Sequence, residues 1–160
     1  MKKRTIFNKN EIFIYSNYCE VILYNRFQAE IAIAKIDKED YYKVKNYKWC
    51  ITSDGYVMNG KNRIKLHQLI LGNRVGHEID HINHDKLDNR KQNLRHCTRS
   101  QNSMNRKDVK GYCWNKINKK WQVFLTINYK NIHLGFFNKE KDAINARKQA
   151  ERKYFGEFAR

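Results

Sequence analysis

Residues 77–102 have the sequence HEIDHINHDKLDNRKQNLRHCTRSQN. The alternation at the start of this segment favours a strand over 76–82. The polar, turn-forming residues that follow predict a loop over 83–90. A second short strand is expected near 93–95.

The residues after this second strand carry the signature of a helix start. Thr98 and Gln101 have the spacing of a capping box, in which the Thr98 hydroxyl accepts from the Gln101 amide and the Gln101 side chain reaches back. A helix is therefore expected to begin near Arg99 and to place Asn102 in its first turn or just beyond. The predicted order is strand, long polar loop, short strand and helix.

The residues before this segment predict a small unit of mixed structure. Residues 11–36 alternate in the way of three short strands. A short helix is expected over about 37–47, and a hairpin over 49–58 surrounds a turn signal at 53–55. Residues 64–71 then favour a short helix or a strand that passes into a helix.

The last third of the chain predicts a sheet covered by one helix. The odd-numbered positions of 121–127 are apolar and the pattern returns over 132–136, after a turn at 128–131. Residues 111–114 add a first strand. The helix is expected to be capped by Asn138, to stop at Gly156 and to carry one stripe made of Ala143, Ala146, Ala150 and Tyr154.

These elements predict an α+β fold in three modules: an N-terminal unit over 1–62, a middle module over 63–107 and a C-terminal sheet with one helix over 108–160. Polar links are expected near 60–66 and 105–110.

The charge of the chain indicates a polyanionic partner. The 160 residues include 33 Lys and Arg against 16 Asp and Glu, for a net charge of +17. The segments 1–66, 67–107 and 108–160 carry +6, +4 and +7, so the charge is not confined to one tail. Nucleic acid is the leading candidate. The alternative is a basic protein whose charge only keeps it in solution.

The sequence gives no sign of a membrane segment or a zinc site. No apolar run approaches eighteen residues and no signal-type segment follows the first residues, so we expect a cytoplasmic protein. Cys19, Cys50, Cys97 and Cys113 form no C-x-x-C pair, which argues against a zinc ribbon and for reduced thiols. His67, His77 and His133 are expected in structural roles.

One set of residues has the chemistry of phosphodiester hydrolysis. That reaction needs a base for water and a cation for the charge that develops on the phosphate. His81 suits the first task because imidazole titrates near neutrality. Asp80 and Asn102 supply oxygen ligands, which favour Mg²⁺ or Mn²⁺. No organic cofactor is expected.

The motifs from His77 to Asn83, Leu87 to Arg90 and Asn93 to Arg95, with Thr98 and Asn102, resemble the HNH endonucleases of phage and homing type. The resemblance covers residues 63–107. It implies two strands and a helix around one divalent metal, and a protein of a bacterial or phage-infected host cell.

Carried over by position, Asp80 and Asn102 are implied as metal ligands and His81 as the general base. Asn93 is implied to order the loop and to help orient His81.

The C-terminal stretch resembles the APETALA/ethylene-response-factor type of DNA-binding domain. The resemblance is carried by Gly111 to Trp114, Lys120-Trp121, Ile132 to Phe137, the Ala-rich helix and Phe155 to Phe158. It implies a sheet that lies in the major groove of double-stranded DNA. Trp121 could serve either the core or the DNA.

Ten residues are candidate DNA contacts, although a solvated basic face is the plainer interpretation for some of them. They are Arg95, Arg99, Arg106, Lys107, Trp114, Lys116, Lys119, Lys120, Gln122 and Thr126.

Two hypotheses follow. The first is a metal-dependent DNA endonuclease that acts at a selected site, as a monomer or as a dimer assembled on DNA. The second is a DNA-binding regulator that does not cleave. Both predict salt-sensitive DNA binding.

Overall fold

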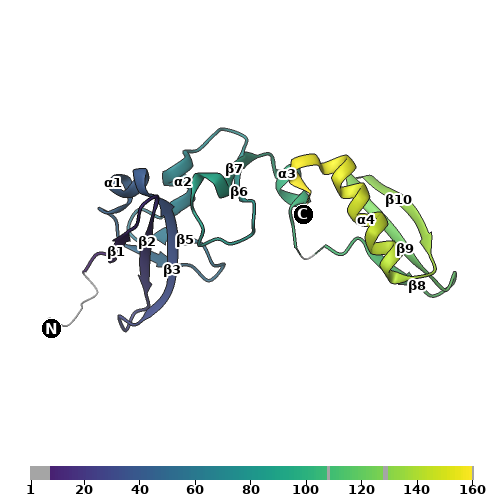
Figure 1. Ribbon diagram of the computed structural model, residues 1–160, viewed down its shortest axis with the longest axis horizontal. Coiled ribbons are helices and arrows are strands. Elements are labelled where there is room, and N and C mark those ends of the chain that lie inside the picture. The colour runs from purple at the N-terminus through teal and green to yellow at the C-terminus, as the bar shows by residue number, and fades with distance from the viewer. Residues whose placement is uncertain (1–7, 108, 128–129, 160) are drawn as a thin grey trace. The chain divides into compact units, whose positions relative to one another are not determined.

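The computed structural model describes residues 8–107, 109–127 and 130–159 (Figure 1). The chain divides into two compact units, Met1–His96 and Cys97–Arg160. Both mix short helices with small antiparallel sheets, which confirms the predicted α+β class. Within the described ranges, no helix is long and apolar enough to cross a membrane.

The elements follow the chain in an order close to the predicted one. They are β1 (Ile12–Ile14), β2 (Tyr18–Tyr24), β3 (Glu30–Asp37), η1 (Lys38–Asp40), α1 (Tyr41–Val44), β4 (Trp49–Ile51), β5 (Val57–Asn59), α2 (Leu66–Leu71), β6 (Glu78–His81), η2 (Lys91–Asn93), β7 (Leu94–Cys97), α3 (Arg99–Met104), β8 (Tyr112–Asn115), β9 (Lys120–Ile127), β10 (Lys130–Phe137), α4 (Glu140–Phe155) and η3 (Gly156–Phe158).

The N-terminal unit is built on the antiparallel sheet β1-β2-β3. Val21 on β2 pairs with Ala34 on β3, and both side chains are buried. Because alternate residues of a strand face one side of the sheet, this register directs the apolar positions of both strands into one core. Trp49 closes that core, and its indole Nε1 donates to the Val44 carbonyl at 3.0 Å.

The same core also includes residues of the predicted middle module. Leu66 and Ile70 on α2 and Leu94 on β7 are buried in one cluster with the residues of β2 and β3. Residues 63–96 therefore pack with the N-terminal residues in a single compact unit. The division of this part of the chain into modules over 1–62 and 63–107 stays a prediction.

The C-terminal unit has the antiparallel strand order β10-β9-β8, with α4 packed against β9 and β10 (Figure 1). Val123 and Leu125 on β9 are fully buried, as is Ala143 on α4. The predicted alternation in this strand is therefore confirmed. Residues 128 and 129 of the predicted turn lie outside the described residues.

Two details of α4 correct the prediction. The residue that caps the helix is Lys139, which has an extended backbone, and not Asn138. Tyr154 is 45% exposed, and Phe155 is buried in its place. The buried face is shifted because Arg147 and Glu151 lie within it and pair at 2.8 Å between Nε and Oε1.

The backbone at Gly111 passes close to the Arg147 guanidinium. The guanidinium donates through Nη1 to the Phe124 carbonyl. Gly111 has a φ of +69°, and a Cβ atom there would lie 2.4 Å from the Arg147 Cζ. Only glycine therefore allows the chain to pass this close to the buried arginine.

Candidate active site

Strand β6 ends in two adjacent buried side chains, Asp80 and His81, which are 7% and 4% exposed. Arg95, on β7 of the same two-stranded sheet, donates to the Asp80 Oδ2 through Nε at 3.0 Å and through Nη2 at 2.7 Å. The buried carboxylate is therefore held by a charge-assisted pair of hydrogen bonds. This contact was not expected, since Arg95 was predicted to meet a DNA phosphate.

Asn89 holds the imidazole of His81. The Asn89 amide nitrogen donates to the carbonyls of Lys86 and Leu87 at 3.2 and 3.1 Å, and this side chain is fully buried. These bonds fix which way the amide faces, so its Oδ1 points to His81 Nε2 at 3.4 Å. An amide oxygen only accepts hydrogen bonds. His81 Nε2 therefore carries the proton, and Nδ1 has the lone pair.

Two further rings pack around His81. The His67 and His81 ring centroids are 5.1 Å apart and nearly perpendicular, and Tyr56 lies 5.2 and 5.9 Å from the two rings. The ammonium groups of Lys65 and Lys86 lie 4.1 and 4.3 Å from the Tyr56 centroid. The candidate base is thus packed against two rings, and two lysines lie against the Tyr56 ring.

Burial sets the charge state of both histidines. It lowers the pKa of His81, against the opposing effect of the Asn89 hydrogen bond and of nearby carboxylates. It lowers the pKa of His67 to about 3, because desolvation disfavours the cation and His81 and Lys65 add to the effect. His81 is therefore neutral near pH 7, in the form that can accept a proton.

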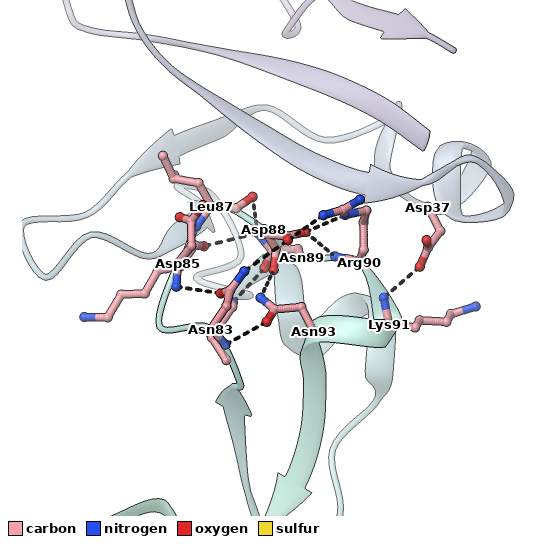
Figure 2. A network of polar contacts seen from close by, with 11 residues as sticks. Asp37, Asn83, Asp85, Leu87, Asp88, Asn89, Arg90, Lys91 and Asn93 are labelled. Carbon is pink, nitrogen blue, oxygen red and sulfur yellow. Dashed lines mark hydrogen bonds and ion pairs between the residues drawn. The ribbon is translucent and has the colours of Figure 1, made fainter. Parts of the chain in front are cut away.

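Asn93 connects the two ends of the loop after β6. Its Oδ1 accepts from the backbone N–H of Asn83 at 2.9 Å, and its Nδ2 donates to the Asp88 backbone carbonyl at 2.8 Å (Figure 2). The Asn93 carbonyl also accepts from the Ile82 amide at 2.9 Å. Asn93 thus orders the loop, while the side chain that contacts the His81 ring is Asn89.

An ion pair stabilises the centre of this loop. Arg90 donates to both carboxylate oxygens of Asp88, at 2.7 and 2.8 Å (Figure 2). These hydrogen bonds hold the pKa of Asp88 below its ordinary value. Asn83 Nδ2 donates a further bond to the same carboxylate at 3.3 Å.

The loop is attached to the edge of the N-terminal sheet. The backbone N–H of Lys35 donates to the Leu87 carbonyl at 2.8 Å. The backbone N–H of Asn89 donates to the Lys35 carbonyl, also at 2.8 Å. The Lys91 amide donates to the Asp37 Oδ2 at 2.7 Å (Figure 2). Strand β3 therefore fixes the backbone of Asn89, and the N-terminal residues help to build the site.

The sequence pattern did not reveal the role of Asn89. The segment from Leu87 to Arg90 was noted as a motif without a function for its asparagine. Its role depends on the loop folding back over β6, which no local periodicity reveals. His67 was expected to pack or to form hydrogen bonds, and the structure shows it packed against His81.

The second predicted metal ligand belongs to the other unit. Asn102 lies on α3, whose start is fixed by the predicted capping box: the Thr98 hydroxyl accepts from the Gln101 amide at 3.2 Å, and Gln101 Oε1 accepts from the Thr98 amide at 2.8 Å. Among the residues the structure describes, no three His, Cys, Asp or Glu side chains gather in a possible metal site. The pairing of Asp80 with Asn102 stays a prediction.

The predicted DNA contacts of the C-terminal unit fall on different surfaces. Trp114 pairs with Trp121 across β8 and β9, with ring centroids 5.4 Å apart, so it shares the face of the apolar stripe. Gln122 and Thr126 lie on the opposite face. The remaining candidates of this unit are exposed: Arg99, Arg106, Lys107, Lys116, Lys119 and Lys120.

Comparison with known proteins identifies the class of the central segment. Residues 72–104 match a protein family described as HNH endonuclease. The chain is also similar to an uncharacterized HNH endonuclease of Acanthamoeba polyphaga mimivirus, with 33% identity over 111 residues. That match covers 65% of this chain and 58% of the relative, so the chain spans little more than half of the relative's length.

No solved structure matches the chain. The family match lies within residues 63–107, where the sequence resembled the same family. Residues 72–104 are therefore similar to an HNH endonuclease domain. The likeness of residues 108–160 to the ethylene-response-factor type stays a prediction.

Proposed function

We propose that this protein is a DNA endonuclease that hydrolyses phosphodiester bonds, with His81 as the general base. The observation that carries the proposal is the buried imidazole of His81, in contact with Asn89 and adjacent to Asp80 within the segment that matches the HNH family. A proton acceptor held in a defined tautomer next to a carboxylate is suited to activating water.

The residues of the N-terminal unit have separate tasks in this proposal. His81 accepts a proton from water through Nδ1 while the water oxygen bonds to phosphorus. The bond from phosphorus to the leaving oxygen breaks, and that oxygen takes a proton from solvent. Asn89 keeps Nε2 protonated, Asn93 keeps the loop closed, and Arg95 holds the Asp80 carboxylate through two hydrogen bonds.

A divalent metal fits the donor set of the proposed site. Asp80 and Asn102 supply only oxygen atoms, the ligands that Mg²⁺ and Mn²⁺ prefer. The Asp80 carboxylate already pairs with the cationic Arg95, so a metal there would share the carboxylate or replace the arginine. When bound, the metal supplies a Lewis acid that stabilises charge on the phosphate.

The proposed substrate is double-stranded DNA. The support for this is the net charge of +17, spread over the whole chain, together with the exposed lysines of the β8–β9 hairpin. Because each chain has one candidate active site, a monomer is expected to nick one strand. Two chains assembled on DNA are expected to cut both strands.

The base assignment is tested by comparing His81→Ala with His77→Ala, a change of a half-buried histidine of the same unit. Cleavage of DNA and affinity for DNA are measured separately on the same preparations. We expect His81→Ala to abolish cleavage and to leave affinity nearly unchanged, while His77→Ala retains both. Normal cleavage by His81→Ala would show that another group is the base.

A further inference from the structure

The C-terminal unit contains a cavity of about 280 Å³ where α3, β9 and α4 meet. Three arginines line it: Arg99 at the start of α3, Arg106 after α3, and Arg147 on α4. In the described part of the chain, no acidic side chain is among the residues that line it. The cavity is therefore suited to an anion.

Arg147 is the fixed element of this group. It is 6% exposed, its Nε donates to Glu151 at 2.8 Å, and its Nη1 donates to the Phe124 carbonyl. These two bonds use two of the five N–H groups of a guanidinium. Glu151 is buried and the Phe124 carbonyl belongs to β9, so these two bonds fix the orientation of the guanidinium plane beside the cavity.

Arg99 and Arg106 are the exposed arginines of this group. Both line the cavity, whereas Arg147 is buried and pairs with Glu151. The forked donors of arginine match two oxygens of a phosphate group. A phosphate that enters between these side chains would therefore meet donors on more than one side.

The remaining wall is apolar and partly aromatic. Met104, Phe124 and Phe155 line the cavity beside the arginines. A phosphate alone gains nothing from such a wall, but a nucleoside does, because bases and sugars pack on aromatic and apolar side chains. The volume is slightly below the roughly 300 Å³ of the smaller sites that enclose drug-sized ligands, so it suits one nucleotide.

We propose that this cavity binds a single nucleotide of a DNA strand, with the phosphate against the arginines and the nucleoside against Met104 and the phenylalanines. The identification of the ligand as part of DNA rests on the proposed endonuclease function. Asn102 lies on the same six-residue helix α3 but is not among the residues that line the cavity. A nucleotide held here would fix the DNA strand relative to Asn102.

The test measures binding by the full chain of thymidine 5′-monophosphate, thymidine and inorganic phosphate, using calorimetry or amide chemical shifts. The pocket variant is the double change Arg99→Gln and Arg106→Gln. Its control is Lys148→Gln with Arg152→Gln, which removes the same charge from exposed positions of α4 outside the cavity. Met104→Gln tests the apolar wall at similar side-chain length.

We expect the monophosphate to bind more tightly than either fragment. The pocket variant should weaken its binding about tenfold to a hundredfold, as expected for lost charge-assisted hydrogen bonds, and the control should not. Met104→Gln should weaken binding of the nucleotide but not of phosphate. All these positions are at least partly exposed, so the variants should fold, as checked by thermal unfolding.

Three results would overturn the proposal: no saturable binding, equal affinity for the nucleotide and for phosphate, or equal loss in the pocket and control variants. Plasmid cleavage is recorded for the same preparations. A protein that binds the nucleotide without cutting DNA contradicts the proposed function alone. A protein that cuts DNA without binding the nucleotide contradicts the cavity assignment alone.

Discussion

At the scale of single residues, the orientation of one buried amide determines the chemistry available to His81. Asn89 donates to two backbone carbonyls, so its oxygen faces the imidazole and selects the tautomer with the proton on Nε2. The proton acceptor is then Nδ1. A histidine free to change tautomer would spend part of its time with this nitrogen blocked.

Asn89→Ala is therefore expected to lower kcat about tenfold to a hundredfold, less than the ~10²–10⁴ that a general base supplies in full. DNA affinity should not change, because Asn89 is fully buried and contacts no solvent. Asn73→Ala, at an exposed position of the same unit, is the control. Nitrogen NMR of the His81 ring should show the Nε2–H tautomer in the parent and a mixture in the variant. An unchanged kcat would exclude this role.

His67 makes stability depend on pH. Its pKa is about 3 in the folded chain against an ordinary value of 6.5, so between these values the unfolded chain binds more protons. The stability that His67 contributes is present above pH 6.5 and is lost as the pH falls toward 3. At pH 5 the loss is about 2 kcal/mol.

Urea unfolding of the parent, His67→Gln and His77→Gln at pH 5 and pH 7.5 measures this effect. The parent and His77→Gln should lose stability at the lower pH, and His67→Gln should lose about 2 kcal/mol less. The same pH dependence in all three proteins would contradict the assignment.

At the scale of elements, local sequence signals predicted most of the fold. The capping box at Thr98, the alternation of β9 and the three strands of residues 11–36 all appear as expected, because each depends on neighbours in the chain. The candidate site residues Asp80, His81 and Asn93 also lie in one short motif, and their roles in catalysis stay predictions. Asn89 was missed because its role needs the contact between the loop and β3.

Helix α4 shows where a local pattern misleads. Arg147 and Glu151 have the spacing of an ordinary surface ion pair, yet both are buried against the sheet. Their burial moves the apolar face by one residue, from Tyr154 to Phe155. Burial of a polar pair depends on tertiary packing, which the helical period does not encode.

Gly111→Ala tests this packing. Gly156→Ala is the matched control, since its φ is also positive, at +54°, but a Cβ there meets no atom within 4 Å. We expect Gly156→Ala to cost about 1–3 kcal/mol through backbone strain. Gly111→Ala should cost about 1–3 kcal/mol more, because the methyl group displaces Arg147. Thermal or urea unfolding gives both values, and equal losses would mean that Arg147 moves aside freely.

At the scale of the whole molecule, the candidate active site depends on the N-terminal residues. Leu66, Ile70 and Leu94 share their core with β2 and β3, and β3 holds the loop of Asn89. The C-terminal unit has its own core, which includes Leu125 and Phe155.

A fragment of residues 63–160 should therefore lose cleavage and should leave residues 63–96 unfolded. The C-terminal unit should stay folded in this fragment. Amide NMR spectra would then show dispersed signals for residues after 96 alone. A fragment that still cleaves DNA would contradict this dependence.

The most direct test of the endonuclease assignment is incubation of the purified protein with supercoiled plasmid, in Mg²⁺ or in EDTA, beside Asp80→Ala. We expect nicked or linear DNA in Mg²⁺ only, and none from the variant. Salt-dependent retardation of DNA without cleavage, in Mg²⁺ or Mn²⁺, would contradict it and would identify a DNA-binding protein that does not cut.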